Sequence, residues 1–117
     1  MRVLVVDDEP DTLQLIAANV LHCGHECVTA GTVDEATRIC TDHTPDAMVL
    51  DVALPGTDGP ALLRELREAG QAPETVMLLS ALAPDALAAT ADELGVAWMS
   101  KPFTADELRA RLTALVS

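Results

Sequence analysis

The chain has 117 residues, which is the length of one domain, and half of them are apolar, so a hydrophobic core can form. The formal net charge is −12, from 19 acidic and 7 basic residues, which argues against general electrostatic binding to nucleic acid. No apolar run is long enough to span a membrane, and the run behind Met1 is too short for a signal peptide. These features predict a cytoplasmic protein that forms a single domain over residues 1–117 and binds neither membrane nor nucleic acid.

The three cysteines, Cys23, Cys27 and Cys40, are an odd number without a Cys-x-x-Cys pair, which argues against a disulfide framework or a zinc ribbon. His22 and His25 lie beside the first two, so a metal site is the alternative to simple packing. These residues span a predicted helix end and strand start, where their side chains should diverge. We therefore favour packing.

The first part of the chain predicts two strand–helix units. Arg2 to Val6 reads as a buried strand, and a helix follows from Pro10 until Gly24 ends it. A second strand covers Cys27 to Ala30, and the capping box of Thr32–Glu35 opens a second helix. The inner face of the first helix is expected to carry Leu13, Ile16, Ala17, Val20 and Leu21.

The rest of the chain predicts three more units. The apolar strand Ala47 to Leu50 precedes a turn-rich segment, residues 55–59, and a helix that ends at Gly70. The strand Val76 to Leu79 precedes a helix at about Pro84 to Leu94, whose mostly alanine inner face predicts the loosest packing. A short strand, Ala97 to Met99, comes before the last helix. That helix should open with the capping box of Thr104 and Glu107. The residues expected to face inward are Leu62, Leu63 and Leu66 in the third helix and Leu108, Leu112 and Leu115 in the fifth.

Strands that are apolar on both faces and alternate with helices indicate a parallel sheet covered on both sides. With right-handed crossovers, this pattern gives a doubly wound α/β fold with five strands and five helices. In such a sheet, ligands bind beyond the carboxyl ends of the strands.

Polar residues follow four of the five predicted strands. They are Asp7, Asp8 and Glu9 after the first strand, Asp51 after the third, Ser80 after the fourth, and Lys101 with Pro102 after the fifth. Converging carboxylates repel one another unless a cation such as magnesium, which prefers oxygen ligands, neutralises them. A lysine and a hydroxyl suit the oxygens of a phosphoryl group, so the set indicates phosphoryl transfer to a carboxylate.

Each member of this set also has a simpler interpretation. Asp7, Asp8 and Glu9 could cap the first helix and favour its dipole, Asp51 could be a turn former, and Ser80 could cap the fourth helix. Lys101 is the only lysine beside six arginines, which could reflect codon usage. The ordered placement of all of them, each after its own strand, favours the functional interpretation.

The motifs resemble those of the receiver domains of two-component response regulators over nearly the whole chain. They are residues 3–10 (VLVVDDEP), 49–59 (VLDVALPGTDG), 79–81 (LSA) and 101–103 (KPF). The resemblance implies a flavodoxin-like sheet with strand order 2-1-3-4-5. It also implies a signalling switch that catalyses its own phosphorylation and dephosphorylation, without the substrate turnover of an enzyme.

The resemblance also implies a role for each site residue. Asp51 would accept the phosphoryl group from the phosphohistidine of a histidine kinase or histidine phosphotransfer protein. Asp8, Asp51 and the backbone carbonyl of Ala53 would hold Mg²⁺ (or Mn²⁺), with Asp7 acting partly through water. Ser80 and Lys101 would bind the phosphoryl oxygens, and Ser80 and Trp98 would form the switch. The peptide bond between Lys101 and Pro102 would be cis.

Three features depart from the family pattern. The switch aromatic is Trp98 instead of tyrosine or phenylalanine, so its inward rotamer should be harder to reach, and a core or interface role is the alternative. The segment Gly95 to Lys101 looks one residue short and lacks an acidic pair common in regulators that dimerise on DNA. Ala53 and Leu82 are apolar where polar groups help to position water, which predicts slow loss of the phosphoryl group.

Other functions with related chemistry are less consistent with the sequence. A magnesium-dependent phosphatase usually has an Asp-x-Asp nucleophile motif, whereas that spacing here gives Asp7 and Glu9. An FMN binder needs a phosphate-cradling loop where three acids stand, and a pseudo-receiver would not need an intact site.

The first helix is the expected contact for the kinase. The fourth helix, the fifth strand and the fifth helix form the expected output face, but the output domain or protein stays unknown.

Overall fold

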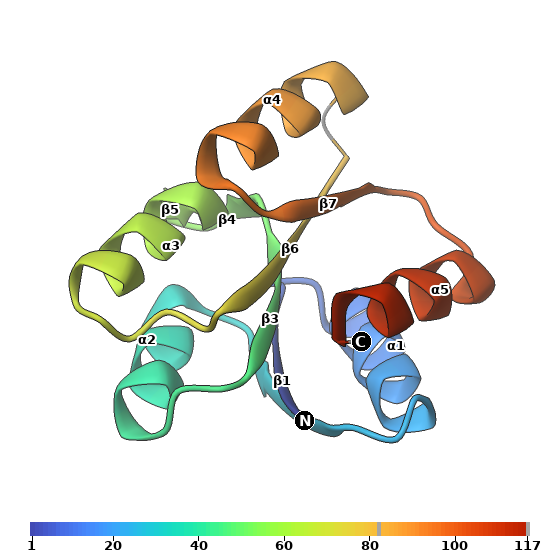
Figure 1. Ribbon diagram of the computed structural model, residues 1–117, viewed down its shortest axis with the longest axis horizontal. Coiled ribbons are helices and arrows are strands. Elements are labelled where there is room, and N and C mark those ends of the chain that lie inside the picture. Colours follow the sequence, from blue (N-terminus) through green and yellow to red (C-terminus); the bar gives the residue numbers. More distant parts are fainter. Residues whose placement is uncertain (82, 117) are drawn as a thin grey trace.

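The computed structural model describes residues 1–81 and 83–116, so Leu82, on which part of the expected slow dephosphorylation rests, lies outside the described residues. Five parallel strands form one sheet between two layers of helices (Figure 1). The strands of this sheet are β1 (Arg2–Val6), β2 (Glu26–Ala30), β3 (Ala47–Asp51), β6 (Thr75–Ser80) and β7 (Ala97–Ser100). The helices are α1 (Pro10–His22), α2 (Val33–Asp42), α3 (Gly59–Glu68), α4 (Pro84–Leu94) and α5 (Ala105–Val116).

The strand order is β2-β1-β3-β6-β7, and every neighbouring pair is parallel. This confirms the predicted order 2-1-3-4-5 and the flavodoxin-like fold. The labels differ because the turn-rich segment forms a small antiparallel hairpin, β4 (Ala53–Leu54) and β5 (Thr57–Asp58), which the sequence pattern did not predict. All strands of the five-stranded sheet run in one direction, so the residues that follow β1, β3, β6 and β7 gather at one edge of this sheet.

The sheet separates two hydrophobic cores. On one face, α2, α3 and α4 pack against alternate strand residues, and α1 and α5 cover the other face (Figure 1). The larger core contains Leu4, Leu50 and Leu78 from the strands and Leu62, Leu66 and Leu87 from the helices, and the second contains Val5, Val49, Ile16 and Leu108. All five residues of β3 are buried, which agrees with the apolar run of its first four residues, and the fifth is Asp51.

Local sequence signals set the helix ends as predicted. The hydroxyl of Thr32 accepts a hydrogen bond from the backbone N–H of Glu35 at 3.2 Å, which confirms the capping box of α2. Thr104 accepts the equivalent bond from Glu107 at 3.1 Å before α5. Gly24 follows α1 with φ +87°, a backbone conformation that side chains disfavour, so the predicted stop is confirmed.

Two predicted helix faces were partly wrong. Leu21 is 59% exposed, whereas Asn19 of α1 is buried, because α5 packs on the Asn19 side of the helix. In α4 the buried residues are Leu87, Ala91 and Leu94, so leucine supplies most of a face that was expected to be mainly alanine.

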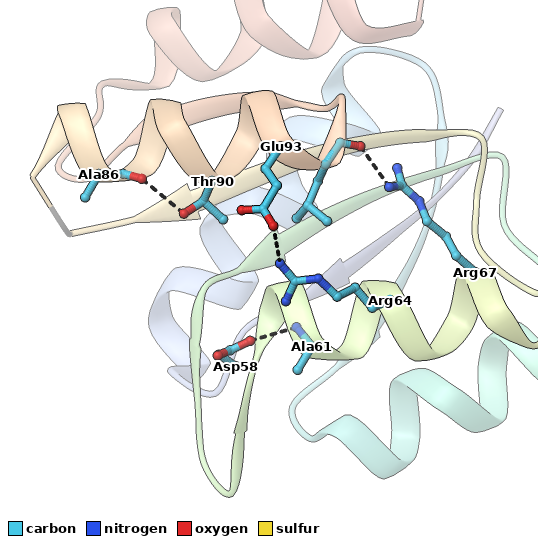
Figure 2. Close-up of polar contacts among 8 residues, drawn as sticks. Asp58, Ala61, Arg64, Arg67, Ala86, Thr90 and Glu93 are labelled. Atoms are coloured by element: carbon cyan, nitrogen blue, oxygen red, sulfur yellow. Dashed lines mark hydrogen bonds and ion pairs between the residues drawn. The ribbon is translucent and has the colours of Figure 1, made fainter.

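Two arginines of α3 reach the C-terminal end of α4 (Figure 2). The Nη1 of Arg67 donates to the backbone oxygen of Leu94 at 2.8 Å, which satisfies one of the carbonyls left open at a helix end. Arg64 and Glu93 form an exposed ion pair at 3.5 Å, which contributes little to stability. The N-cap of α4, Ala83, offers no side-chain hydrogen bond, so α4 is held more firmly at its C-terminal end.

Among the described residues, no helix combines the length and the apolar character that crossing a membrane requires.

Candidate functional site

Three aspartates meet where β1 and β3 end. Asp7 and Asp51 are almost fully buried, at 1% and 5% exposure, whereas Asp8 is exposed to solvent. One carboxylate oxygen from each lies within 4.8 Å of the other two. Within residues 1–81 and 83–116, no second group of three potential ligands meets this distance, so the histidines and cysteines at 22–27 form no such group. The sequence thus located the one acidic cluster with ligand spacing in this part of the chain.

The single lysine completes the cluster from the neighbouring side. The Nζ of Lys101 donates a hydrogen bond to Asp7 Oδ2 at 2.9 Å and lies 3.6 Å from Asp51 Oδ1. Its backbone N–H donates to the carbonyl of Ser80 at 2.8 Å, which fixes the start of the loop after β7. The peptide bond between Lys101 and Pro102 is cis, as expected from the resemblance. The position of Lys101 therefore depends on both β6 and β7.

The carboxylate of Asp7 is held at both oxygens. Oδ1 accepts the backbone N–H of Glu9 at 2.9 Å, and Oδ2 accepts the ammonium group of Lys101. The sequence interpretation gave Glu9 no part in the site beyond its negative charge. Its backbone amide orients Asp7, and this contribution leaves no signature in the residue type.

The cluster contains more negative than positive charge. Burial raises the pKa of Asp51, and Asp7 and Asp8 raise it further, while Lys101 and the backbone amide of Ala53 lower it. The pKa of Lys101 is raised as well, because its contacts with Asp7 and Asp51 outweigh the effect of burial. One ammonium group thus faces three carboxylates. A divalent cation that prefers oxygen ligands fits this donor set and would relieve the repulsion.

The backbone after Asp51 is supported by a residue that sequence reasoning missed. The N–H of Gly59 donates to the carbonyl of Val52 at 2.8 Å, and the N–H of Val52 donates to Leu79 at 2.9 Å. A side chain on Gly59 would overlap the carbonyl oxygen of Asp51. A glycine at the first position of a helix, next to a functional strand end, is the sequence signal for such a close approach.

Ser80 and Trp98 lie on β6 and β7, the two strands that follow β3 in the sheet. Ser80 is the last residue of β6, is 2% exposed and pairs in register with Ser100. Trp98 pairs with Leu78 and is half-buried against the core under α4. Ala53 follows Asp51 by two residues, and its side chain is exposed. The structure therefore places all the predicted site residues at or next to the same edge of the sheet.

The family model of the response regulator receiver domain matches residues 3–113 of this chain. The transcriptional regulatory protein KdpE of Mycobacterium tuberculosis is 38% identical to it over 97% of the chain. PhoP of Bacillus subtilis, the alkaline phosphatase synthesis transcriptional regulatory protein, is 33% identical over 98% of the chain. These matches cover 50% and 48% of the two relatives, so the chain spans about half the length of the regulators that it resembles.

Solved structures of receiver domains have the same fold. The receiver domain of the Francisella response regulator 1452 superposes with a TM-score of 0.85 at 30% identity, covering 97% of this chain and 94% of that one. The BeF3-activated N-terminal receiver domain of Klebsiella pneumoniae RstA gives a TM-score of 0.84 at 30% identity, over 99% and 98% of the two chains. The sequence match over residues 3–113, together with the shared fold, shows that this chain belongs to the response regulator receiver domain family.

Proposed function

We propose that Asp51 accepts a phosphoryl group from the phosphohistidine of a histidine kinase or histidine phosphotransfer protein, and that the chain then signals by changing conformation. The observation that carries this proposal is the convergence of three carboxylates and one partly buried lysine beyond the strand ends. The family membership supports it independently.

The proposed transfer assigns a task to each residue. An Oδ of Asp51 attacks the phosphorus as the phosphorus–nitrogen bond to the donor histidine breaks, and that nitrogen keeps the bonding electron pair. Lys101 stabilises the negative charge on the phosphoryl oxygens, and the hydroxyl of Ser80 donates a hydrogen bond to one of them.

Asp8, Asp51 and the backbone carbonyl of Ala53 would hold Mg²⁺ (or Mn²⁺), with Asp7 contributing partly through water. The bound ion would supply charge neutralisation between the carboxylates and the incoming phosphoryl group. The burial of Asp51 matters for the same reason, because few water molecules then compete for these charges.

The phosphorylated state is proposed to be read through Ser80 and Trp98. Movement of Ser80 towards the phosphoryl group would open space beside β7 that the indole of Trp98 then fills. The chain would act as a switch without turnover of a substrate, and it would lose its phosphoryl group slowly because Ala53 offers no polar group to position water.

Partners and location are inferred from the family. Regulators about twice as long match this chain over half their length, so we propose that residues 1–117 form a single receiver domain that acts on an output domain or a separate output protein. We propose that it works in the cytoplasm, and that its net charge of −12 keeps this domain itself off nucleic acid and membrane surfaces.

Incubation with acetyl phosphate and Mg²⁺, followed by intact-mass measurement, tests the proposal. We expect a gain of one phosphoryl group per chain, and loss of this gain in Asp51→Asn. Asp42→Asn is the matched control, because Asp42 is an exposed aspartate at the end of α2. Steady release of phosphate without a stable adduct would instead support a phosphatase. An adduct that persists in Asp51→Asn would disprove the assignment of the acceptor.

A further inference from the structure

One buried hydroxyl near the site has no hydrogen-bond partner among the described residues. It is the Oγ of Ser100, the last residue of β7. Buried polar atoms are nearly always paired, so an unpaired hydroxyl next to a proposed switch needs an explanation. A hydroxyl that is paired in only one of two conformations biases the equilibrium towards that conformation.

A suitable donor lies on the same strand. Trp98 and Ser100 are two residues apart on β7, so their side chains project from the same face, while Met99 between them packs into the core under α1 and α5. Two successive positions on one face of a strand are about 6.6 Å apart, a gap that the indole ring and the serine hydroxyl together can span. No hydrogen bond from the indole N–H of Trp98 to a described residue is found.

Trp98 borders open space on a strand that is tied to α5. A pocket of about 370 Å³ borders Trp98 and Ser100 at the free edge of β7 and is also lined by Pro102, Glu107 and Arg111. The Nη1 of Arg111 donates to the backbone oxygen of Trp98 at 3.2 Å, which ties the strand to α5. A change of the Trp98 rotamer would thus take place next to this space, on a backbone that Arg111 helps to hold.

The register of the sheet connects Ser100 to the phosphorylation site. Ser100 pairs with Ser80 and Trp98 pairs with Leu78, so Ser100 and Ser80 lie side by side at the end of the face that carries Trp98. Movement of Ser80 towards Asp51 would clear the space next to Ser100. An indole that enters this space takes its N–H out of water, and the N–H then needs an acceptor.

We propose that Ser100 is the residue that positions the switch: its Oγ accepts a hydrogen bond from Trp98 Nε1–H in the phosphorylated state and holds the ring inward. This inference rests on the proposed function and deepens it. It also explains how tryptophan can serve in a position where the family usually has tyrosine or phenylalanine, because the chain provides an acceptor for the additional donor.

Trp98 is the only tryptophan, so its fluorescence reports on its own movement. Beryllofluoride with Mg²⁺ serves as the phosphoryl mimic, and calorimetry measures its binding. In the wild type, binding should move the emission to shorter wavelength as the ring becomes buried. In Ser100→Ala, binding should persist with a reduced emission shift and about fivefold weaker affinity, as expected for one lost hydrogen bond. Ser100→Thr, which keeps the hydroxyl, should restore both.

A second background separates hydrogen bonding from packing. In Trp98→Phe there is no N–H to pair, so adding Ser100→Ala should leave the beryllofluoride affinity unchanged. An equal loss in both backgrounds, or a wild-type emission shift in Ser100→Ala, would overturn the role of Ser100. Normal binding without any emission shift in the wild type would overturn it too, together with the proposed switch role of Trp98, while leaving phosphoryl acceptance by Asp51 intact. Failure of the wild type to bind beryllofluoride would overturn both.

Discussion

Replacing Gly59 with alanine tests how the backbone of Asp51 is held in place. Gly59 is the first residue of α3, which packs directly onto the end of β3. An added Cβ would overlap the carbonyl oxygen of Asp51, and it would lie 3.2 Å from the carbonyl carbon of Asp51 and 3.0 Å from Leu50 Cγ. The obstructing atoms are mainly backbone, so a side-chain rotation cannot relieve the overlap.

The size of the stability loss in Gly59→Ala depends on which part of the structure must move. α3 is anchored by Leu62, Leu63 and Leu66, all at most 2% exposed, so the helix cannot withdraw without opening the core. Forcing an additional methyl group into a packed region costs about 1–3 kcal/mol. Alanine returns at most about 1 kcal/mol through its better helix propensity. Because the overlapped atoms belong to the backbone, we place the cost at about 2–3 kcal/mol, which leaves a net loss of about 1–2 kcal/mol in the free energy of unfolding.

Urea unfolding measures this loss, and Gly31→Ala is the matched control. A Cβ on Gly31 would lie 3.9 Å from Glu35 Oε1 and 4.0 Å from the carbonyl oxygen of Asp7, which is ordinary contact, so its stability should change by less than about 0.5 kcal/mol. Gly59→Ala should also slow phosphorylation by acetyl phosphate, because displacement of the Asp51 carbonyl moves the acceptor. A Gly59→Ala protein as stable as the wild type would refute the close-packing argument.

Three further predictions concern charge, helix attachment and phosphoryl lifetime. The raised pKa of Asp51, due first to burial, means that the native state binds a proton more readily than the unfolded chain, so ionised Asp51 destabilises the metal-free fold. At pH values above the folded-state pKa of Asp51, Asp51→Asn in EDTA should therefore have a higher urea midpoint than the wild type. This gain should fade as the pH falls through the folded-state pKa and should be absent below the unfolded-state pKa. Equal midpoints at neutral pH would contradict the prediction. Arg67→Ala should lower the free energy of unfolding by about 0.5–1.5 kcal/mol, because its hydrogen bond to Leu94 is lost, whereas Arg64→Ala should lower it by less than about 0.5 kcal/mol. If urea unfolding shows a larger loss for Arg64→Ala than for Arg67→Ala, the attachment described for α4 is wrong. Because Ala53 is apolar, phospho-Asp51 should persist beyond seconds at neutral pH with Mg²⁺, and decay within seconds in a mass-spectrometric time course would disprove the expectation.

The elements that were predicted correctly are those with local causes. A capping box such as Thr32 with Glu35 acts within one helical turn, and a run such as Ala47–Leu50 is buried on both faces whatever its neighbours are. The positions of Asp7, Asp51 and Lys101 could also be predicted, because parallel strands bring their carboxyl ends to one edge of the sheet once the strand order is known. Here residue type and topology were sufficient.

The features that were missed depend on which surfaces meet in three dimensions. Helical periodicity gave the direction of the α1 face but not the place where α5 packs. Leu21 was therefore wrongly expected to face inward, and the burial of Asn19 was missed. The bond from Arg109 Nε to Asn19 Oδ1, at 2.7 Å, joins residues 90 positions apart and leaves no local pattern. The unpaired hydroxyl of Ser100 is likewise a consequence of packing, since an isolated strand would expose it to water.

The proposal of Asp51 as the acceptor is supported by how each of the three aspartates is held. Asp7 has both carboxylate oxygens occupied, by Glu9 and Lys101, and is 1% exposed, so it is poorly suited to attack phosphorus. Asp8 is exposed, where water competes for its charge. Asp51 combines burial with a longer contact of 3.6 Å to Lys101, which leaves its oxygen more available while a cation stays close. The shorter bond of Lys101 to Asp7 keeps the lysine beside the place where a phosphoryl oxygen would arrive, and this asymmetry supports Asp51 as the acceptor.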